Sequence, residues 1–387
     1  MRYFQLLGYF IKVSAILFIS SLQILLTMKS SWRVIGLMSG TSLDGLDAAY
    51  CGFTRNDDKW QYELLGTFFV PYPHELQKEL QNIYHESARN LVHWNLELGK
   101  WYGKVVRDQV LQMKWQPDFI ASHGQTIFHD PAKGYTTQIG DAMALHLAAG
   151  IPVIADFRHL DVLLGGQGAP LVPIGDKHLF SDYDFRLNIG GFANISFEKD
   201  GETIAYDISA ANIIINDLAC KLGKPYDHNG ELGAKGILDP LLLNTLNQLD
   251  FYKAKPPKSL GYEWVENEVW PALSQSDLSL TDQLHTYYHH LAFQISNAIL
   301  NQKDNGKLLI TGGGAHNSFL VELIRYYSKN TRIILPDKNI IDYKEAIIFA
   351  FLGLLRWLGE PNTLSSATGA SQDSSGGIIY NNIHPKK

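Results

Sequence analysis

The segment Trp32–Phe53 reads WRVIGL, MSGTSLDG and LDAAYCGF, and it sets the class of the fold. Its two β-rich runs, Trp32–Leu37 and Leu46–Phe53, enclose a short polar stretch, which predicts a strand, a tight turn and a second strand. Small residues in such a turn let backbone N–H groups and hydroxyls point at an anion. Asp44 and Asp47 would repel a phosphate, so they fit there only if Mg²⁺ lies in between. The alternative is an ordinary turn without a ligand.

Two further glycine turns follow. Asn188–Asn194 (NIGGFAN) lies between β-rich runs, and Leu309–Asn317 (LITGGGAHN) joins an apolar strand to a helix. Three glycines after a strand let a phosphate or a planar ligand approach the backbone at a helix N-terminus. The turn does not fit G-x-G-x-x-G, and the chain has no G-x-x-x-x-G-K-[ST] motif. Both absences argue against a Rossmann dehydrogenase and a P-loop enzyme.

Each half of the chain begins with strand, glycine turn and strand, and then continues with mixed helices and strands. This recurrence predicts two related α/β domains with a cleft between them. We expect an N-terminal extension at 1–27, domains at 28–160 and 161–371, and a polar tail at 372–387. The other expected strands and helices are Gln61–Pro71, Pro73–Gln112, Phe119–Ser122, Asp141–Ala149, Asn212–Leu222, Leu284–Asn301, Ser318–Ser328 and Lys344–Leu358.

The composition is that of a globular protein. Of 387 residues, 45% are hydrophobic and 19% charged, and the net charge is −6. A mildly acidic chain has no overall attraction to nucleic acid or to an anionic membrane, so we expect neither as a partner. Cys51 and Cys220 are the only cysteines. They cannot form a disulfide framework, which favours a reducing compartment and a cytoplasmic location.

The apolar segment Met1–Thr27 allows three interpretations. It resembles a signal peptide, although no clear cleavage site follows. A membrane anchor needs about 20 apolar residues, and Lys12 interrupts the run. The third interpretation is that translation starts at Met28, because Met28-Lys-Ser-Ser-Trp leads directly into the first strand. We favour the third.

Polar residues are dense in the middle of the chain, and several could line a polyhydroxylated ligand. The alternatives are that Asp141 caps the helix that follows it and that Asp156 pairs with Arg158. A metal-binding pair of His123 and His129 is disfavoured by the six-residue spacing, and no metal ligand is assigned. The candidates for ligand binding are His123, Gln125, Asp141, Arg158 and Gln167.

Two residues of the second half are further candidates. Asp207 ends a β-rich run, where a carboxylate can face a cleft as a general base; it can also simply cap the helix of Asn212. Glu345 begins an apolar helix, as a cleft residue or as a favourable charge in the first turn.

Together the three glycine turns resemble the two phosphate loops and the adenosine loop of the actin, hexokinase and heat-shock-chaperone ATPase superfamily. Within it the chain resembles the anhydro-N-acetylmuramic acid kinase family over about residues 33–371. The similar motifs are Gly36–Asp47, Ser122–Thr126, Gln138–Asp141, Asp156–Arg158, Gly165–Pro173, Asn188–Asn194, Gly223–Asp227, Gly312–Asn317 and Thr368–Ser371.

The resemblance implies two ribonuclease-H-like α/β domains around a nucleotide and substrate cleft. It implies an ATP- and Mg²⁺-dependent reaction in peptidoglycan recycling. Water opens 1,6-anhydro-N-acetylmuramic acid at the anomeric carbon, and O6 takes the γ-phosphoryl group, giving N-acetylmuramic acid 6-phosphate and ADP. The implied assembly is a homodimer.

The resemblance also implies roles for residues. Asp207 is the expected general base, and Arg158 is a candidate for the lactyl carboxylate. The residues expected to bind the nucleotide are Gly40, Thr41, Ser42, Leu43, Asp44, Gly45, Leu46, Asp47, Gly190, Gly191, Asn194, Gly312, Gly313, Gly314 and Asn317. Those expected to bind the sugar are His123, Gln125, Asp141, Arg158, Gln167, Asn212 and Glu345.

The chain departs from the family pattern at one place. Where the family has Asp-Thr-Gly-Pro-x-Asn, this chain has Asp207-Ile-Ser-Ala-Ala-Asn212. The aspartate and asparagine are kept, but a threonine hydroxyl is lost. Two alternatives stay open: a kinase of another sugar on the same fold, and a nucleotide-binding sensor without turnover.

Overall fold

The computed structural model describes residues 30–40, 42–56, 59–256, 258–303 and 305–381. The interpretations of Met1–Thr27 concern residues outside this part, and so does Thr41 of the first glycine turn. In the ranges described, none of the helices has the length and apolar character needed to cross a membrane.

The first sheet is built around the first glycine turn. Its strands are β1 (Ser31–Met38), β2 (Gly45–Asn56), β3 (Lys59–Pro71), β4 (Phe119–Ser122), β7 (Val153–Ala155) and β13 (Ile378–Tyr380). They lie in the order β13-β7-β4-β1-β2-β3. β1, β2 and β3 form an antiparallel meander, and β4 and β7 continue the sheet in parallel.

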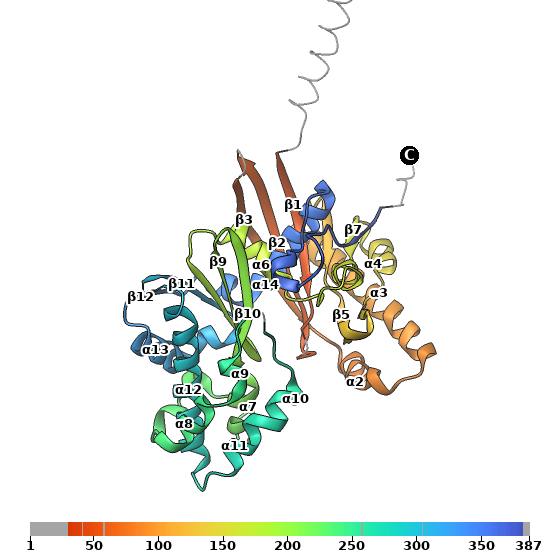
Figure 1. Cartoon of the computed structure of the whole chain (residues 1–387). Helices are drawn as coiled ribbons and strands as arrows, with labels where there is room; N and C mark the ends of the chain where they lie inside the picture. The colour runs from red at the N-terminus through yellow and green to blue at the C-terminus, as the bar shows by residue number, and fades with distance from the viewer. Residues whose placement is uncertain (1–29, 41, 57–58, 257, 304, 382–387) are drawn as a thin grey trace, which may run out of the picture.

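The second sheet repeats this plan. Its strands are β8 (Phe185–Ile189), β9 (Phe192–Lys199), β10 (Glu202–Ala210), β11 (Gly306–Thr311) and β12 (Thr331–Ile334). β8, β9 and β10 form the antiparallel meander, and β11 and β12 are the parallel strands. Two mixed α/β sheets of one design confirm the expected fold class. Figure 1 shows them as separate parts of the molecule.

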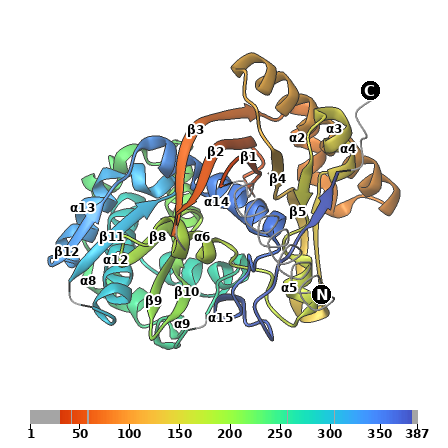
Figure 2. The same ribbon diagram turned by 90° about the horizontal axis from the view of Figure 1, so that it is seen from above.

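Helices cover both faces of the first sheet. On one face α3 (Ala88–Met113) and α4 (Ala142–Ala149) bury Leu98, Tyr102 and Leu145 against β1 and β2. On the other face α14 (Lys338–Leu358) packs closely, because Gly36 leaves room for its backbone. A Cβ at Gly36 would lie 1.9 Å from the carbonyl oxygen of Ala346. α14 lies between the two sheets in both views (Figure 2).

The second sheet packs against α7 (Asn212–Lys221), α12 (Leu280–Leu300) and α13 (Ser318–Tyr327). α12 begins four residues before the expected Leu284, because the Ser279 hydroxyl caps it by accepting a hydrogen bond from Asp282 N. The remaining elements are short. They are α2 (His74–Asn82), η1 (Ile83–His85), β5 (Gln125–Asp130), η2 (Pro131–Lys133), β6 (Tyr135–Ile139), α5 (His159–Leu163), α6 (Val172–Leu179), η3 (His228–Gly230), η4 (Gly233–Lys235), α8 (Pro240–Asn247), α9 (Asp250–Lys253), α10 (Tyr262–Trp264), η5 (Val265–Val269), α11 (Trp270–Ser274), η6 (Gly313–His316) and α15 (Ser365–Thr368).

The domain limits at 160/161 and 371/372 stay predictions. The structure adds that the C-terminal part of the chain returns to the first sheet. Phe349 and Phe351 of α14 pack against the face of the first sheet that lies opposite α3 and α4, and β13 pairs with β7 at the edge of this sheet. The hairpin β5–β6 had no clear sequence signal.

Candidate active site between the two halves

The first glycine turn joins β1 to β2. Its backbone is closed by a hydrogen bond from Leu43 N to the carbonyl oxygen of Gly40 at 3.3 Å, and Leu43 has a positive φ of 52°. The Ser42 hydroxyl donates to Asp44 Oδ1 at 2.7 Å. Leu46 is fully buried in the sheet core, so its side chain is not available to a ligand. The expected turn is confirmed as a turn; its role toward phosphate stays a prediction.

The second and third glycine turns lie against each other. Asn212 at the start of α7 is bound to the second turn, because its N donates to the carbonyl oxygen of Gly190 at 3.1 Å and its side-chain amide to that of Ile189 at 3.4 Å. A Cβ at Gly312 would lie 2.6 Å from Asn188 Oδ1, and one at Gly313 would meet only Asn212 Nδ2 at 3.8 Å. The structure thus brings together Gly190, Gly191, Asn212, Gly312, Gly313 and Gly314.

Asn317 has a structural role at the third turn. Its Oδ1 accepts a hydrogen bond from Leu320 N at 3.0 Å and caps α13, and its amide donates to the Tyr288 hydroxyl at 2.7 Å. Both contacts are internal to the fold, so a contact of Asn317 with a nucleotide stays a prediction.

α14 connects the first turn with the third. Its Ile341 carbonyl oxygen accepts from Gly312 N at 3.3 Å, and its Asp342 lies 2.6 Å from His316 Nε2. Burial, and then the charges of Asp44, Glu345 and Asp342, raise the pKa of Asp47 to about 7. A carboxyl group crowded by other carboxylates is suited to a site that receives a cation together with its ligand.

This crowding predicts a pH-dependent effect of Asp47→Asn on stability. The folded-state pKa of Asp47 lies near 7, above its ordinary 3.8, so the folded chain holds the proton more tightly. The stability that the protonated Asp47 side chain gives to the fold is therefore fully present below about pH 4 and is lost as the pH rises through about 7. Above pH 7 the variant should melt about 2–4 °C higher than the parent chain, the shift that about 1 kcal/mol gives in a large domain.

At pH 4 the gain should vanish, as thermal unfolding at both pH values will show. Asp108→Asn removes a carboxylate 3.6 Å from Arg107 on the exposed side of α3 and is the control. An equal Tm change of Asp47→Asn at both pH values would contradict the assigned repulsion.

A cavity of about 700 Å³ lies between the two halves. The first expected domain contributes the hairpin of His129, and the second contributes the loop of Gln167, β9, β10 and the segment 258–260. Of the predicted site residues, Gln167, Asn194 and Asp207 line this cavity. His123, Gln125, Asp141, Arg158, Asn212 and Glu345 are not among its lining residues.

Asp207 stands in the wall of this cavity at a bulge of β10. Its Oδ2 accepts a hydrogen bond from Leu260 N at 2.9 Å. Burial raises its pKa, and the Leu260 bond opposes part of that rise. It does not cap α7: that helix begins at Asn212 after Ala211, which makes no side-chain cap. The segment Ile208–Ala211, which departs from the family pattern, still leads from β10 into α7. Its Ala211 N donates a hydrogen bond to the carbonyl oxygen of Gly191 at 2.8 Å.

His123, Arg158 and Glu345 form one polar cluster, in which His123 is buried and the other two are half-buried. Arg158 Nε donates to His123 Nε2 at 3.0 Å, and its Nη1 donates to the carbonyl oxygen of Gly168 at 2.7 Å. Burial, and then Arg158, lower the pKa of His123 well below its usual value. Burial raises the pKa of Glu345, and Arg158 opposes that rise. Burial lowers the pKa of Arg158 to about 10.

Two other candidates have structural partners. Asp141 Oδ1 accepts from Ala144 N at 2.7 Å and caps α4, as the alternative interpretation predicts. Gln125 Oε1 accepts a hydrogen bond from the buried Ser39 hydroxyl. Asp156 lies 3.6 Å from His159 Nδ1. Sugar contacts of Asp141 and Gln125 stay predictions.

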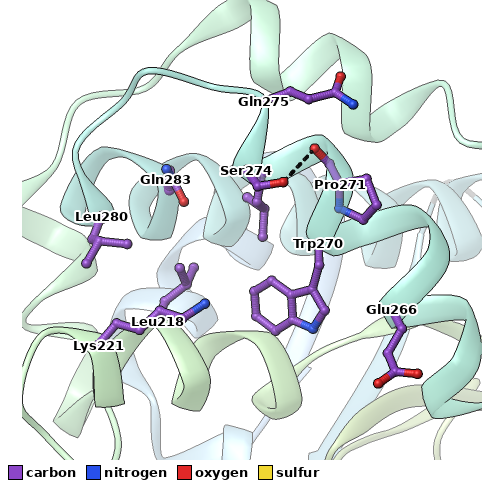
Figure 3. A pocket seen from close by; sticks show the side chains of 10 residues that line it. Leu218, Lys221, Glu266, Trp270, Pro271, Ser274, Gln275, Leu280 and Gln283 are labelled. Atoms are coloured by element: carbon purple, nitrogen blue, oxygen red, sulfur yellow. Dashed lines mark hydrogen bonds between the residues drawn. The ribbon is translucent and has the colours of Figure 1, made fainter.

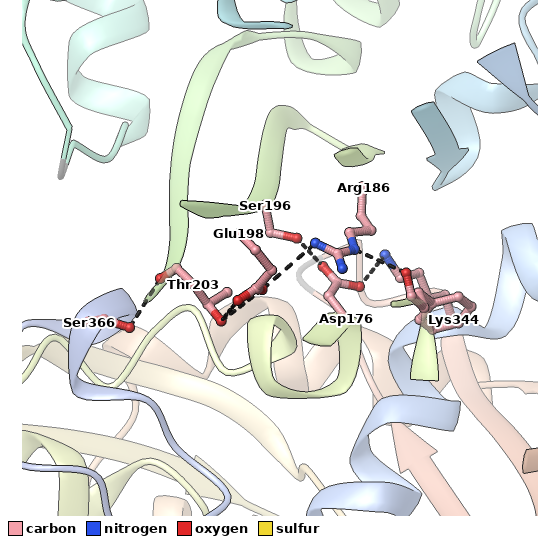
Figure 4. Close-up of polar contacts among 8 residues, drawn as sticks. Asp176, Arg186, Ser196, Glu198, Thr203, Lys344 and Ser366 are labelled. Carbon is pink, nitrogen blue, oxygen red and sulfur yellow. Dashed lines mark hydrogen bonds and ion pairs between the residues drawn. The ribbon is translucent and has the colours of Figure 1, made fainter. Parts of the chain in front are cut away.

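A polar network beside the cavity involves residues of α14, α6 and the second sheet (Figure 4). Lys344 Nζ of α14 lies 2.7 Å from Asp176 Oδ1 of α6, and the Ser196 hydroxyl of β9 donates to Asp176 Oδ2 at 2.6 Å. Arg186 Nη1 lies 3.8 Å from Glu198 in the second sheet. Asp176 and Ser196 both line the cavity. The ion pair of Lys344 and Asp176 joins α14 to α6, and the Ser196 hydrogen bond joins α6 to the second sheet.

Removing Lys344 from this pair should destabilise the chain strongly. Both side chains are only 4% exposed, so Lys344→Met leaves a buried carboxylate unpaired, which costs about 3–5 kcal/mol of unfolding free energy. Urea unfolding measures the loss. Arg325→Met, which breaks an exposed pair with Glu322 at 3.0 Å, should cost less than about 1 kcal/mol. The double variant Asp176→Asn/Lys344→Met should recover part of the loss; a neutral effect of Lys344→Met would refute the pairing.

Sequence reasoning missed several residues of the cavity wall, which are Tyr206, Lys258, Ser259, Leu260 and Thr368. Lys258–Leu260 lies in a region without periodic apolar residues, so no pattern placed it beside Asp207. A second cavity of about 470 Å³ lies between α7, α11 and α12 and contains none of the predicted site residues (Figure 3). Within the described ranges, no group of three or more His, Cys, Asp and Glu residues could hold a metal ion.

Comparison with known proteins identifies the family. The family model described as "Anhydro-N-acetylmuramic acid kinase" matches residues 32–382. The proteins of that name from Mannheimia succiniciproducens and Bacillus cereus are 34% and 33% identical, covering 89% and 90% of this chain and 98% of each relative. A ROK family glucokinase from Streptomyces griseus, in complex with glucose and AMPPNP, matches with 11% identity over 83% of this chain and 98% of its own, at a TM-score of 0.37. The match over nearly the whole described chain shows that it belongs to the anhydro-N-acetylmuramic acid kinase family.

Proposed function

We propose that the chain opens 1,6-anhydro-N-acetylmuramic acid with water and phosphorylates its O6, producing N-acetylmuramic acid 6-phosphate and ADP. Membership of the family supports the reaction, and one observation supports the position of its general base. The Asp207 carboxylate stands in a cavity between the two halves, held by a backbone N–H and with its pKa raised by burial.

Asp207 is the general base in this proposal. It accepts a proton from the water whose oxygen bonds to the anomeric carbon, and the bond from that carbon to O6 breaks. O6 then takes the γ-phosphoryl group of ATP, and ADP leaves. A base with a raised pKa holds the proton better than an ordinary aspartate does, and positioned base catalysis contributes about 10²–10⁴-fold.

The nucleotide is assigned to the three glycine turns. Gly40–Asp47 supports the first phosphate contacts, Gly190, Gly191 and Asn194 the second, and Gly312–Gly314 with Asn317 the adenosine. Asp44 and Asp47 suit Mg²⁺, because this ion binds one or two carboxylates together with substrate phosphates. The raised pKa of Asp47 fits such a site, because burial and the charges of Asp44, Glu345 and Asp342 disfavour its ionised form and a bound cation would offset them. When bound, Mg²⁺ neutralises phosphate charge during transfer.

The sugar is assigned to His123, Gln125, Asp141, Arg158, Gln167, Asn212 and Glu345. Gln167 lines the cavity, and its N donates to the carbonyl oxygen of Thr368 at 2.9 Å. The Asp161 carboxylate fixes the same loop by accepting from Gly168 N and from the Thr368 hydroxyl, each at 2.7 Å. We also propose a cytoplasmic location, consistent with two free cysteines, and a homodimer, which light scattering can test.

The test is ADP release by the full chain with ATP, Mg²⁺ and either the anhydro sugar or N-acetylmuramic acid, whose O6 is already free. We expect the chain to turn over the anhydro sugar much faster than N-acetylmuramic acid. Preference for the open sugar would indicate an ordinary sugar kinase instead. ATP binding without turnover of either sugar would indicate a sensor.

A further inference from the structure

A single lysine side chain lines the cavity whose wall contains Asp207. Among its described lining residues, Lys258 is the only lysine or arginine. The Lys258 carbonyl oxygen accepts a hydrogen bond from Asp207 N at 3.1 Å. The backbone of Lys258 is therefore hydrogen-bonded to β10, the strand that contains the proposed base. Arg158, the sequence-based candidate for a substrate carboxylate, points its guanidinium at His123 and Gly168.

The Lys258 ammonium group has donors to spare. Its Nζ donates to the carbonyl oxygen of Phe251 at 3.0 Å and lies 4.3 Å from the centre of the Phe251 ring. An ammonium group has three N–H donors, so this contact occupies one. The side chain is half-buried. Burial lowers the pKa of Lys258, and no described carboxylate offsets the shift.

A half-buried cation without an anionic partner is costly unless a ligand supplies the charge. A carboxylate is the partner that matches it, because charge-assisted hydrogen bonds are about twice as strong as neutral ones. The proposed substrate carries one such group, on its lactyl ether. We propose that Lys258 binds this carboxylate and thereby makes the site selective for acidic over neutral 1,6-anhydro amino sugars. The inference rests on the proposed function.

The experiment compares the parent chain, Lys258→Met and Lys258→Arg. Each is assayed with 1,6-anhydro-N-acetylmuramic acid and with 1,6-anhydro-N-acetylglucosamine, which lacks the lactyl group, and the binding of each sugar is measured by calorimetry. Loss of a charge-assisted bond should lower kcat/KM for the acidic sugar by about 10- to 100-fold, mainly through KM. Kinetics and binding of the neutral sugar should change less than threefold. Lys258→Arg should keep most of the preference.

Lys253→Met is the control, because Lys253 is exposed on the same segment and pairs with Asp250 at 2.8 Å. It should behave as the parent does. An equal loss on both sugars would overturn the inference and assign Lys258 to Asp207 or the nucleotide. No loss on the acidic sugar would overturn it too. A parent chain that turns over neither sugar contradicts the proposed function instead, and the calorimetric comparison still tests Lys258.

Discussion

Asp207→Asn should abolish sugar turnover while leaving ADP affinity nearly unchanged. Asparagine keeps the size and can still accept the hydrogen bond that Leu260 N gives to Asp207 at 2.9 Å, but it cannot take a proton from water. We expect kcat to fall by about 10²–10⁴-fold, the usual contribution of a positioned general base. A coupled assay of ADP release measures kcat, and calorimetry measures ADP binding.

Asp200→Asn is the matched control. It makes the same change in the turn between β9 and β10, where Asp200 has a positive φ of 53° that asparagine also adopts readily. It should leave kcat and ADP affinity as in the parent chain. A parent-like kcat for Asp207→Asn would remove Asp207 as the base.

Gly313→Val should prevent nucleotide binding without unfolding the chain. Gly313 is exposed, and an added Cβ would meet only Asn212 Nδ2 at 3.8 Å. The protein can therefore hold the side chain, which would occupy the space in which a nucleotide approaches the third turn. We expect ATP affinity to fall by at least about 100-fold, the cost of about 2.8 kcal/mol, with a parent-like Tm.

Gly314→Val makes the contrasting change one residue on. Its Cβ would lie 2.2 Å from Ile189 Cγ2, so this variant should lose stability first, with a lower Tm. Unchanged ATP affinity in a folded Gly313→Val variant would refute the assignment of this turn to the nucleotide.

Local patterns predicted the strands and the turns. Trp32–Leu37 and Phe119–Ser122 are short apolar runs bounded by glycine or polar residues, and each forms a strand within two residues of its expected limits. The capping role of Asp141 was foreseen as an alternative, because capping depends on residues close in sequence.

Long-range contacts carried no such signal. Asp342 and Glu345 reach Asp47 only because α14 returns from the far end of the chain to pack on Gly36. Lys258 lies beside Asp207 because its carbonyl oxygen accepts a backbone hydrogen bond from Asp207 N, although Lys258 is in a segment without regular periodicity. Which polar groups share a wall depends on how the two sheets meet, and one sequence does not contain that information.

The mass of the sugar product tests the central claim most directly. The full chain is incubated with 1,6-anhydro-N-acetylmuramic acid, ATP and Mg²⁺, and the product is weighed by mass spectrometry. We predict that the sugar gains one phosphate and one water together, with one ADP released per product. A product that gains phosphate but no water, or water but no phosphate, would contradict the account.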